Sequence, residues 1–480
     1  MLISRNRCNR RFMKKRSISP YLLVIISFVV VIIIGAFLLV TPFCQKSGQW
    51  AFNYVSEDGL TRISFIDCLF AAVSATCVTG LCTFGAGIGG ALTFTGQVVV
   101  LIMIQIGGLG FITVLTFVVT LFKSKLQFKD RFYLSQALNA TNFADVVVFV
   151  RKIIIISFVC EFIGFILGLP VAFILYPERP LMALWTSLFT SVSAFNNAGF
   201  DIFGSTSLIA SADTIMGQLK ETTTWAYYYY LSYIMVLVVL GGLSFLVITE
   251  VFSFRKSAKQ YSAFTKIVLT TTLVLLVFGF VGFIISDVIV EHNISIFDAA
   301  FQSVTCRTAG FASFDQSTLS TAGNTLSCIL MFIGGSPLST AGGIKTTTIF
   351  IIVIAVVSHL RGKQVVAFNR LYSENTVLKG MTLLVVAVIA VITSYVFVSL
   401  FEEGNTEATS SSIFFETFSA FGTVGLTANL TPTLSLGSKI TLCIMMFLGR
   451  LGPMTFFQVF RTNNEASGHY QYVEADFLIG

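Results

Sequence analysis

The sequence predicts an all-α integral membrane protein whose eight transmembrane spans form four repeats of helix, re-entrant loop and helix. Three observations predict this class. Hydrophobic residues make up 55% of the 480 residues and charged residues only 11%, whereas a soluble domain carries about 25% charged residues. Eight stretches are apolar and long enough to cross a bilayer. Four short segments between these stretches resemble one another, as in a protein built from internal repeats.

Each apolar stretch is close to the roughly 20 residues that a helix needs to cross a bilayer. The first follows a basic segment, but its apolar run exceeds the ~7–15 residues of a signal peptide, so we expect a retained helix. The sixth contains Pro337, paired glycines and Lys345, and the eighth contains Arg450. The expected spans are Tyr21–Val40, Phe94–Phe122, Ile153–Tyr176, Trp225–Phe252, Ile267–Ser286, Leu326–Ser358, Met381–Phe401 and Lys439–Phe460.

Lysine and arginine concentrate on one side of the predicted membrane. If eight helices alternate in direction, 22 of the 30 Lys and Arg residues fall on the side of the two termini. Basic loops stay in the cytoplasm, so both termini are expected to be cytoplasmic in a multi-pass protein of the cell membrane. This topology accounts for the net charge of +7, and we expect no nucleic-acid partner.

One segment recurs four times along the chain. Each copy starts with Phe, continues with small and hydroxyl residues, and contains a glycine followed by Leu or Phe. The four glycines are separated by 119, 111 and 115 residues, and each lies between two predicted spans. The copies are Phe70–Gly85, Phe189–Gly204, Phe301–Asp315 and Phe415–Leu430.

The repeats divide the chain into four units with a basic segment at each end. The boundaries are a cytoplasmic N-terminus at 1–20, repeats at 21–125, 150–256, 264–360 and 378–461, and a cytoplasmic tail at 462–480. The apolar part of each recurring segment is too short to span a bilayer but long enough to enter and return. Its short helix needs an N-cap, and its C-terminal end would point a negative dipole into the membrane. Candidate N-caps are Asp67, Ser187, Asp298 and Ser411 or Ser412.

The glycines end four triplets whose backbone oxygens could replace the hydration shell of a cation, as in tetrameric potassium channels. Glycine suits this position because an inward carbonyl requires backbone angles that a Cβ disfavours. No triplet contains a carboxylate, which argues against a divalent ion. The triplets are Val78-Thr79-Gly80, Asn197-Ala198-Gly199, Thr308-Ala309-Gly310 and Thr423-Val424-Gly425.

The sequence contains few signs of metal binding, nucleotide binding or catalysis. The nine cysteines form no C-x-x-C pair and the three histidines are far apart, so zinc spacing is missing. Gly85–Gly90 matches G-x-G-x-x-G but follows no strand, which argues against dinucleotide binding. We expect no enzyme activity and no cofactor in this chain.

These loops, the eight spans and the interrupted sixth span resemble the membrane subunit of the Trk/Ktr/HKT potassium-uptake superfamily over roughly residues 20–460. The resemblance is closer to KtrB-like members than to TrkH-like members, which carry two further N-terminal helices. It implies a filter built by the four triplets, with K⁺ as the transported ion and the only metal bound there. Glycine at Gly80, where sodium-favouring members often have serine, implies potassium selectivity. A homodimer and a cytosolic regulatory ring of nucleotide-binding domains are also implied.

Proline and glycine interrupt the sixth span, because proline removes a backbone donor and glycine loosens a helix. The resemblance implies an intramembrane gating loop at 334–345 under the filter. The alternative is a kink that only aids helix packing. The implied gate residues are Gly334, Gly335, Ser336, Pro337, Ser339, Thr340, Ala341, Gly342, Gly343, Lys345 and Arg450.

Three charges stand out near these segments. A charge at mid-membrane costs at least ~2.5–3.5 kcal/mol, so Arg450 should face the pore, where the resemblance places a flux-limiting arginine, or pair with Glu161 or Glu250. Lys345 is expected at the cytoplasmic edge of the loop. Arg307 is expected to be a brace that pairs with one of three acids, Asp298, Asp315 or Glu416.

A second transport mechanism stays open from the residues. A symporter that couples potassium to Na⁺ or H⁺ would want an acidic residue at mid-membrane, and Glu161 is the candidate. Such transporters are usually built from inverted pairs of repeats. Four parallel units therefore favour ion flow down the electrochemical gradient.

Overall fold

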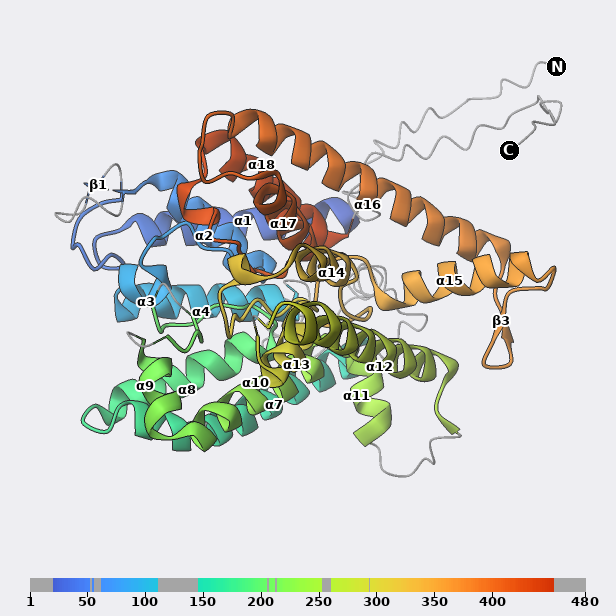
Figure 1. Cartoon of the computed structure of the whole chain (residues 1–480), viewed down its shortest axis with the longest axis horizontal. Coiled ribbons are helices and arrows are strands. Elements are labelled where there is room, and N and C mark those ends of the chain that lie inside the picture. Colours follow the sequence, from blue (N-terminus) through green and yellow to red (C-terminus); the bar gives the residue numbers. More distant parts are fainter. Residues whose placement is uncertain are drawn as a thin grey trace, which may run out of the picture.

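The computed structural model describes residues 20–51, 54–55, 62–110, 146–204, 207–211, 214–252, 260–292 and 294–452. The basic N-terminus, most of the basic loop after the second span and the 462–480 tail lie outside the described residues, as do the ends of two predicted spans, 111–122 and 453–460. Apart from two small hairpins, the regular secondary structure of the described chain is helical (Figure 1).

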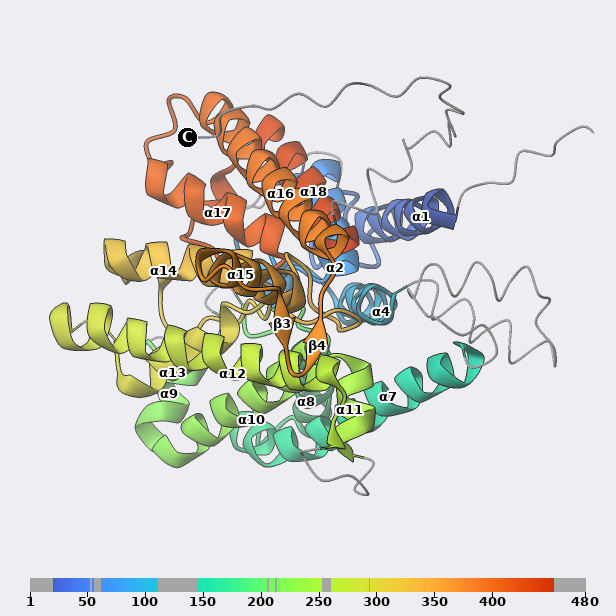
Figure 2. The same ribbon diagram turned by 90° about the vertical axis from the view of Figure 1, so that its right-hand side faces the viewer.

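The helices fall into four consecutive groups, which Figure 2 shows around a common centre. The first two groups are α1 (Pro20–Val40), α2 (Phe65–Cys77), α3 (Gly87–Ala91) and α4 (Phe94–Leu109), then α7 (Val146–Leu175), α8 (Pro180–Phe195), α9 (Ile215–Thr222), α10 (Thr224–Gly242) and α11 (Phe245–Phe252). The other two are α12 (Ala263–Phe283), η2 (Ile284–Val290), α13 (Ile296–Thr305), η3 (Gln316–Thr318), α14 (Thr321–Phe332) and α15 (Thr346–Leu360), then α16 (Glu374–Phe401), α17 (Ser410–Gly422), η4 (Thr431–Thr433) and α18 (Leu436–Leu451).

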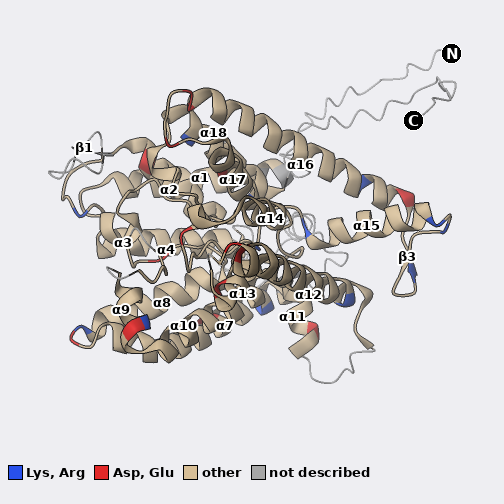
Figure 3. Ribbon diagram, in the orientation of Figure 1, with Lys and Arg blue, Asp and Glu red and all other residues tan. Residues whose placement is uncertain are grey.

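Two antiparallel hairpins complete the described chain. Strands β1 (Tyr54–Val55) and β2 (Arg62–Ile63) follow α1, and β3 (Val366–Ala367) and β4 (Arg370–Leu371) join α15 to α16. In Figure 3 the turn that carries β3 is mainly basic, while most acidic segments lie toward the opposite end of the bundle.

Helices occur at all eight predicted stretches, but two stretches are broken. Within the described residues, four helices are long and apolar enough to cross a membrane: Val148–Leu175, Thr224–Gly242, Ala263–Val290 and Glu374–Phe401. The stretch predicted as Trp225–Phe252 breaks at Leu243, between α10 and α11. The stretch predicted as Leu326–Ser358 contains a long non-helical segment between α14 and α15, so it is more than a kinked helix.

The distribution of polarity is the reverse of that in a soluble protein. The long helices expose large apolar side chains, such as Phe162 on α7, Leu273 on α12 and Ile389 on α16. The centre instead buries many hydroxyl and amide side chains, including Ser74, Asn196 and Thr423. Apolar faces of this extent need lipid to cover them, so the fold is that of an all-α membrane protein.

The short helices α2, α8, α13 and α17 correspond to the predicted re-entrant helices, but every predicted N-cap is wrong. Each helix starts earlier than expected, and the caps are Ser64, Arg179, Ser295 and Thr409. Asp67 and Asp298 lie three residues after their cap. Asp67 accepts a hydrogen bond from the Ser64 backbone N–H, which completes a capping box.

An ion pair joins the last group of helices to the first. Lys439 Nζ, near the start of α18, lies 2.7 Å from Asp67 Oδ1 on α2, and the Asp67 side chain is almost fully buried. The groups therefore close on one another at this end of the bundle.

Candidate functional site

The four recurring glycines meet in a closed ring. A Cβ built on Gly80 would lie 2.6 Å from the carbonyl oxygen of Ala198, and one on Gly199 would lie 2.6 Å from that of Ala309. A Cβ on Gly310 would be closer still to the Val424 oxygen, and one on Gly425 to the Thr79 oxygen. Each glycine thus faces the middle residue of the next triplet, and the fourth faces the first.

Both ends of each triplet take the left-handed conformation. The glycines have φ between +67° and +102°, which a residue with a Cβ rarely adopts. The first residues have φ of 57° at Val78, 58° at Asn197, 73° at Thr308 and 51° at Thr423. For β-branched Val and Thr this is a strained geometry. The left-handed conformation recurs in all four triplets and is strained in three of them, which supports a functional reason for it.

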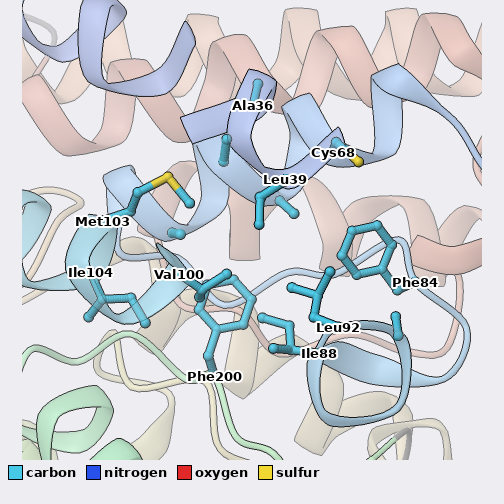
Figure 4. Close-up of a cluster of buried hydrophobic side chains, with 14 of the residues drawn as sticks. Ala36, Leu39, Cys68, Phe84, Ile88, Leu92, Val100, Met103, Ile104 and Phe200 are labelled. Atoms are coloured by element: carbon cyan, nitrogen blue, oxygen red, sulfur yellow. The ribbon is translucent and has the colours of Figure 1, made fainter. Parts of the chain in front are cut away.

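The Leu or Phe after each glycine anchors its segment in the preceding group of helices. Phe200 belongs to a buried cluster with Leu39 of α1 and Val100 of α4, which Figure 4 shows. Leu81, Phe311 and Leu426 lie in equivalent clusters with the fourth, second and third groups. All four side chains are buried. The cores that hold the ring together therefore bridge neighbouring groups.

A hydroxyl residue in the last turn of each short helix was not anticipated. Ser74 Oγ accepts from the Gly80 N–H at 3.0 Å and Ser419 Oγ from the Gly425 N–H at 3.1 Å. In the third group Thr305 Oγ1 donates to the Phe311 carbonyl at 2.7 Å. The sequence held a signal for this role, because Ser or Thr recurs at the same place in all four copies. In the second copy it is Ser193.

A second recurring glycine was also missed. Gly107, Gly241 and Gly449 lie near the ends of α4, α10 and α18, and a Cβ on any of them would lie within 3.0 Å of a backbone oxygen in the last turn of the adjacent short helix. Those oxygens belong to Thr76, Phe195 and Phe421, each four residues before a ring glycine. The glycine pairs Gly107-Gly108 and Gly241-Gly242 were the available signal for two of them, whereas Gly449 stands alone in the sequence. These glycines let two helices touch backbone to backbone.

The pair Gly241 and Gly242 allows a matched test of this contact. Gly241→Ala is expected to lower the melting temperature of the detergent-solubilised protein, because overpacking against a backbone oxygen costs about 1–3 kcal/mol. Gly242→Ala should change it little, since its Cβ would approach only Asn197 Nδ2, at 3.4 Å. Equal melting temperatures for the two variants in a thermal-unfolding assay would contradict this account.

A cavity of about 150 Å³ adjoins the ring. All four ring glycines line it, together with Asp201, Asp315 and Thr427 from the loops that follow. Burial raises the pKa of Asp201 to about 6, although hydrogen bonds from Ser207 and from the Phe203 N–H oppose the shift. The cavity therefore has a carboxylate in its wall, beside the ring.

The loop between α14 and α15 lies against the other side of the ring. Gly342 packs so closely on Thr423 that a Cβ there would fall within 3.0 Å of Thr423 Oγ1. The Thr340 N–H and Oγ1 donate to the Gly241 oxygen at 3.2 and 2.8 Å, and the Gly343 N–H donates to the Gly449 oxygen at 3.2 Å. The loop thus closes on the C-terminal ends of α10 and α18.

More contacts hold the start and the end of this loop. The Ser336 N–H and Oγ both donate to the Gly242 oxygen, at 3.1 and 2.7 Å. Gly334 and Gly335 are buried, Pro337 is half-buried, and Ser339 Oγ donates to the Ser336 oxygen at 2.7 Å. Lys345, at the cap of α15, donates from Nζ to the Ala341 oxygen at 2.6 Å.

Arg450 bonds this loop to α4. Its guanidinium donates to the backbone oxygens of Thr340, Gly107 and Gly108, the last at 3.0 Å. The alternative of an ion pair with a nearby acid does not describe this contact, because both candidate acids bond elsewhere in the described chain. Glu161 accepts from Gln105 and Asn196, and Glu250 from Ser262 and Thr265.

The expected ion pair of Arg307 is wrong. Its guanidinium donates to the backbone oxygens of Thr272 and Gly334, each at 3.3 Å. The three candidate acids accept from neutral groups instead: Asp298 from Ser295 and Ser313, Asp315 from Asn429, and Glu416 from Thr427 and Thr431. The side chain lies between α12 and the start of the loop between α14 and α15, and its hydrogen-bond partners in the described chain are backbone oxygens.

An all-α membrane bundle in which four short helices end at one ring of glycines suits a membrane transport protein. The family model described as "TrkH: Cation transport protein" matches residues 13–470. The chain belongs to this family of cation transport proteins, and it is not an enzyme.

Three similar proteins illustrate the relationship. The potassium/sodium uptake protein NtpJ of Enterococcus hirae is 35% identical over 98% of this chain and 99% of its own length. The Ktr system potassium uptake protein B of Bacillus subtilis is 34% identical over 96% of this chain and 97% of its own. The crystal structure of the potassium transporter TrkH from Vibrio parahaemolyticus has a similar fold, with a TM-score of 0.65, 16% identity and coverage of 94% and 86%.

Proposed function

We propose that this protein is a potassium-selective uptake subunit that conducts K⁺ down its electrochemical gradient through a filter formed by the four triplets. The observation that carries the proposal is the closed ring, in which each glycine faces the backbone oxygen of the next triplet. Backbone oxygens at such a constriction can replace the water that a monovalent cation sheds. The relatives named for potassium uptake support the choice of ion.

The loop at 334–345 is the proposed gate, and Arg450 holds it in the closed position. The loop lies against Thr423 at the start of one triplet, and Arg450 ties it to α4. A fixed positive charge beside the pathway would repel a cation. Opening would require the loop to leave the ends of α10 and α18.

The finer architecture belongs to the same proposal. It comprises eight spans with pseudo-four-fold symmetry, both termini in the cytoplasm of a cell-membrane protein, and a homodimer. A separate cytosolic ring of nucleotide-binding domains would regulate the gate. The Ktr-system name of the relatives from Bacillus subtilis supports a partner subunit.

Purified protein in liposomes tests the conduction mechanism. A current that reverses at the potassium equilibrium potential supports the filter. A reversal potential that shifts with the sodium or proton gradient in a fixed stoichiometry would support the alternative, a coupled symporter. The buried carboxylate of Glu161, bonded to the residue before the second triplet, is the observation that favours this second mechanism.

Gly80→Ser is expected to raise the permeability to sodium relative to potassium. The Cβ of the new serine would lie 2.6 Å from the Ala198 oxygen, and the residue would have to keep φ near +102°. The ring would therefore shift, and the serine hydroxyl would add a new ligand for the ion. The relative permeability follows from reversal potentials with potassium on one side and sodium on the other. An unchanged permeability ratio would show that Gly80 does not contribute to the selectivity of the filter.

A further inference from the structure

The residue immediately before each triplet differs among the four segments, although the glycines are repeated. These residues are Cys77, Asn196, Arg307 and Gly422. Each lies at the end of its short helix or within two residues after it, so it sets the direction in which its triplet leaves that helix. In the second segment this residue is Asn196, which is fully buried.

The Asn196 amide is held by two side chains from other helices. Its Nδ2 donates to Glu161 Oε1 of α7 at 3.0 Å and lies 3.1 Å from Gln105 Oε1 of α4. Gln105 Nε2 donates to the same Glu161 oxygen at 2.9 Å. These three residues, Glu161, Gln105 and Asn196, are called the Glu161 bracket below.

The carboxylate of Glu161 in this bracket is buried beside apolar side chains, where a charge is unfavourable. Glu161 is only 4% exposed, and Phe158, Phe162 and Leu188 line the apolar groove beside it. A buried carboxylate without donors is strongly destabilising, and two amide donors offset that cost only in part. Since an apolar pair would pack here at lower cost, the bracket points to a function that needs directed hydrogen bonds.

The opposite side of Asn196 has no free space. A Cβ on Gly108 would lie within 3.0 Å of Asn196 Oδ1, and the Gly108 oxygen accepts from Arg450 at 3.0 Å. Asn196 is therefore clamped between α7 and the end of α4. The next residue, Asn197, has φ of 58° and its amide lies 3.2 Å from Thr308 Oγ1 of the third segment.

We propose that the Glu161 bracket is a selectivity determinant, which positions the second filter segment by holding the Asn196 amide. This inference rests on the proposed function. Selectivity is a difference between the affinities for two ions, and the second triplet faces both Gly80 and Ala309. A small rotation of Asn196 would move the second triplet relative to both the first and the third triplet. It would therefore alter the preference for K⁺ over Na⁺, and not only the amount of folded protein.

The test compares four variants in liposomes with potassium on one side and sodium on the other. Glu161→Leu and Asn196→Leu remove the hydrogen bonds, and we expect each to raise sodium permeability relative to potassium by about threefold to tenfold. Glu161→Gln keeps an acceptor oxygen for both amides and should restore the wild-type ratio. The control is Glu178→Gln, an exposed residue between α7 and α8, which should leave the ratio unchanged.

Different outcomes would contradict the proposed function and the role of the Glu161 bracket. A wild-type current that does not reverse at the potassium potential contradicts the proposed function itself. With a potassium-selective wild type, a smaller current at an unchanged ratio in Glu161→Leu would overturn the bracket, because the residue would then serve folding alone. A Glu161→Gln variant as unselective as Glu161→Leu would also overturn the role of the bracket. The hydrogen bonds that residue 161 accepts would then not determine the preference for K⁺ over Na⁺.

Gln105 provides a second route if Glu161→Leu fails to fold. Gln105 is half-buried, and Gln105→Leu removes one donor to Glu161 and one acceptor of Asn196. The same rise in relative sodium permeability is expected. An unchanged ratio in this variant counts against the bracket as directly as in the first.

Discussion

Gly425→Ala is expected to abolish potassium conduction while leaving the protein in the membrane. The new Cβ would lie within 3.0 Å of both the Thr79 oxygen and the Gly80 Cα. Neither is a flexible side-chain end that can turn aside. The residue would also have to hold φ at +93°, which a residue with a Cβ disfavours.

The clash falls where the fourth segment meets the first, so two of the four triplets must move apart. Filter oxygens replace a hydration shell only at matched distances, and misplaced ones no longer compensate the loss of water. Neighbouring cores that contain Leu81 and Leu426 remain intact, which should preserve the fold.

Rescue of a cell that lacks potassium uptake, followed by flux into liposomes, measures this effect. The matched control is Gly380→Ala on α16, whose Cβ would make ordinary contacts with the side chains of Ile352, at 3.5 Å, and Thr348, at 3.8 Å. Normal potassium flux through Gly425→Ala would show that conduction does not pass through the ring.

Deleting Ala341–Gly343 should raise potassium flux. The deletion removes the Gly343 N–H that bonds the Gly449 oxygen, and it removes Gly342, which packs on Thr423. It also pulls Thr340 away from Gly241 and Arg450. Losing two or more such bonds, at about 1 kcal/mol each, would favour the open state by roughly tenfold or more.

Potassium flux into liposomes at a fixed voltage is the measurement. The control deletes Gly362–Gln364, an equally short piece of the exposed turn after α15, and should leave the flux near that of the wild type. A flux that stays the same or falls in the Ala341–Gly343 variant would assign the loop a packing role.

The class of protein and the place of its site followed from local patterns. Apolar stretches predict membrane helices because the bilayer imposes their length and composition. The four glycines stood out because a left-handed backbone position selects glycine wherever it recurs. Gly80, Gly199, Gly310 and Gly425 were identified this way, and the structure brings all four together.

Positions that depend on neighbours in space were predicted poorly. Three of the four N-caps were misplaced by two or three residues, because Ser64, Ser295 and Thr409 cap their helices ahead of the polar residues that were chosen. The fourth was wrong because α8 begins at Pro180, after Arg179, without a side-chain cap. The expected partners of Arg307 were acids nearby in the sequence. The short helix instead turns this side chain toward backbone oxygens of α12 and the interrupted span.

Composition and periodicity were enough to predict the membrane helices, the repeats and the ring glycines, because the lipid and the backbone conformation constrain each residue locally. The partners across the ring depended on the tertiary structure. Gly241 against the Phe195 oxygen, Arg450 against Gly108 and Glu161 against Asn196 each join segments far apart in the sequence. Such contacts depend on how whole helices pack, and no local pattern encodes that.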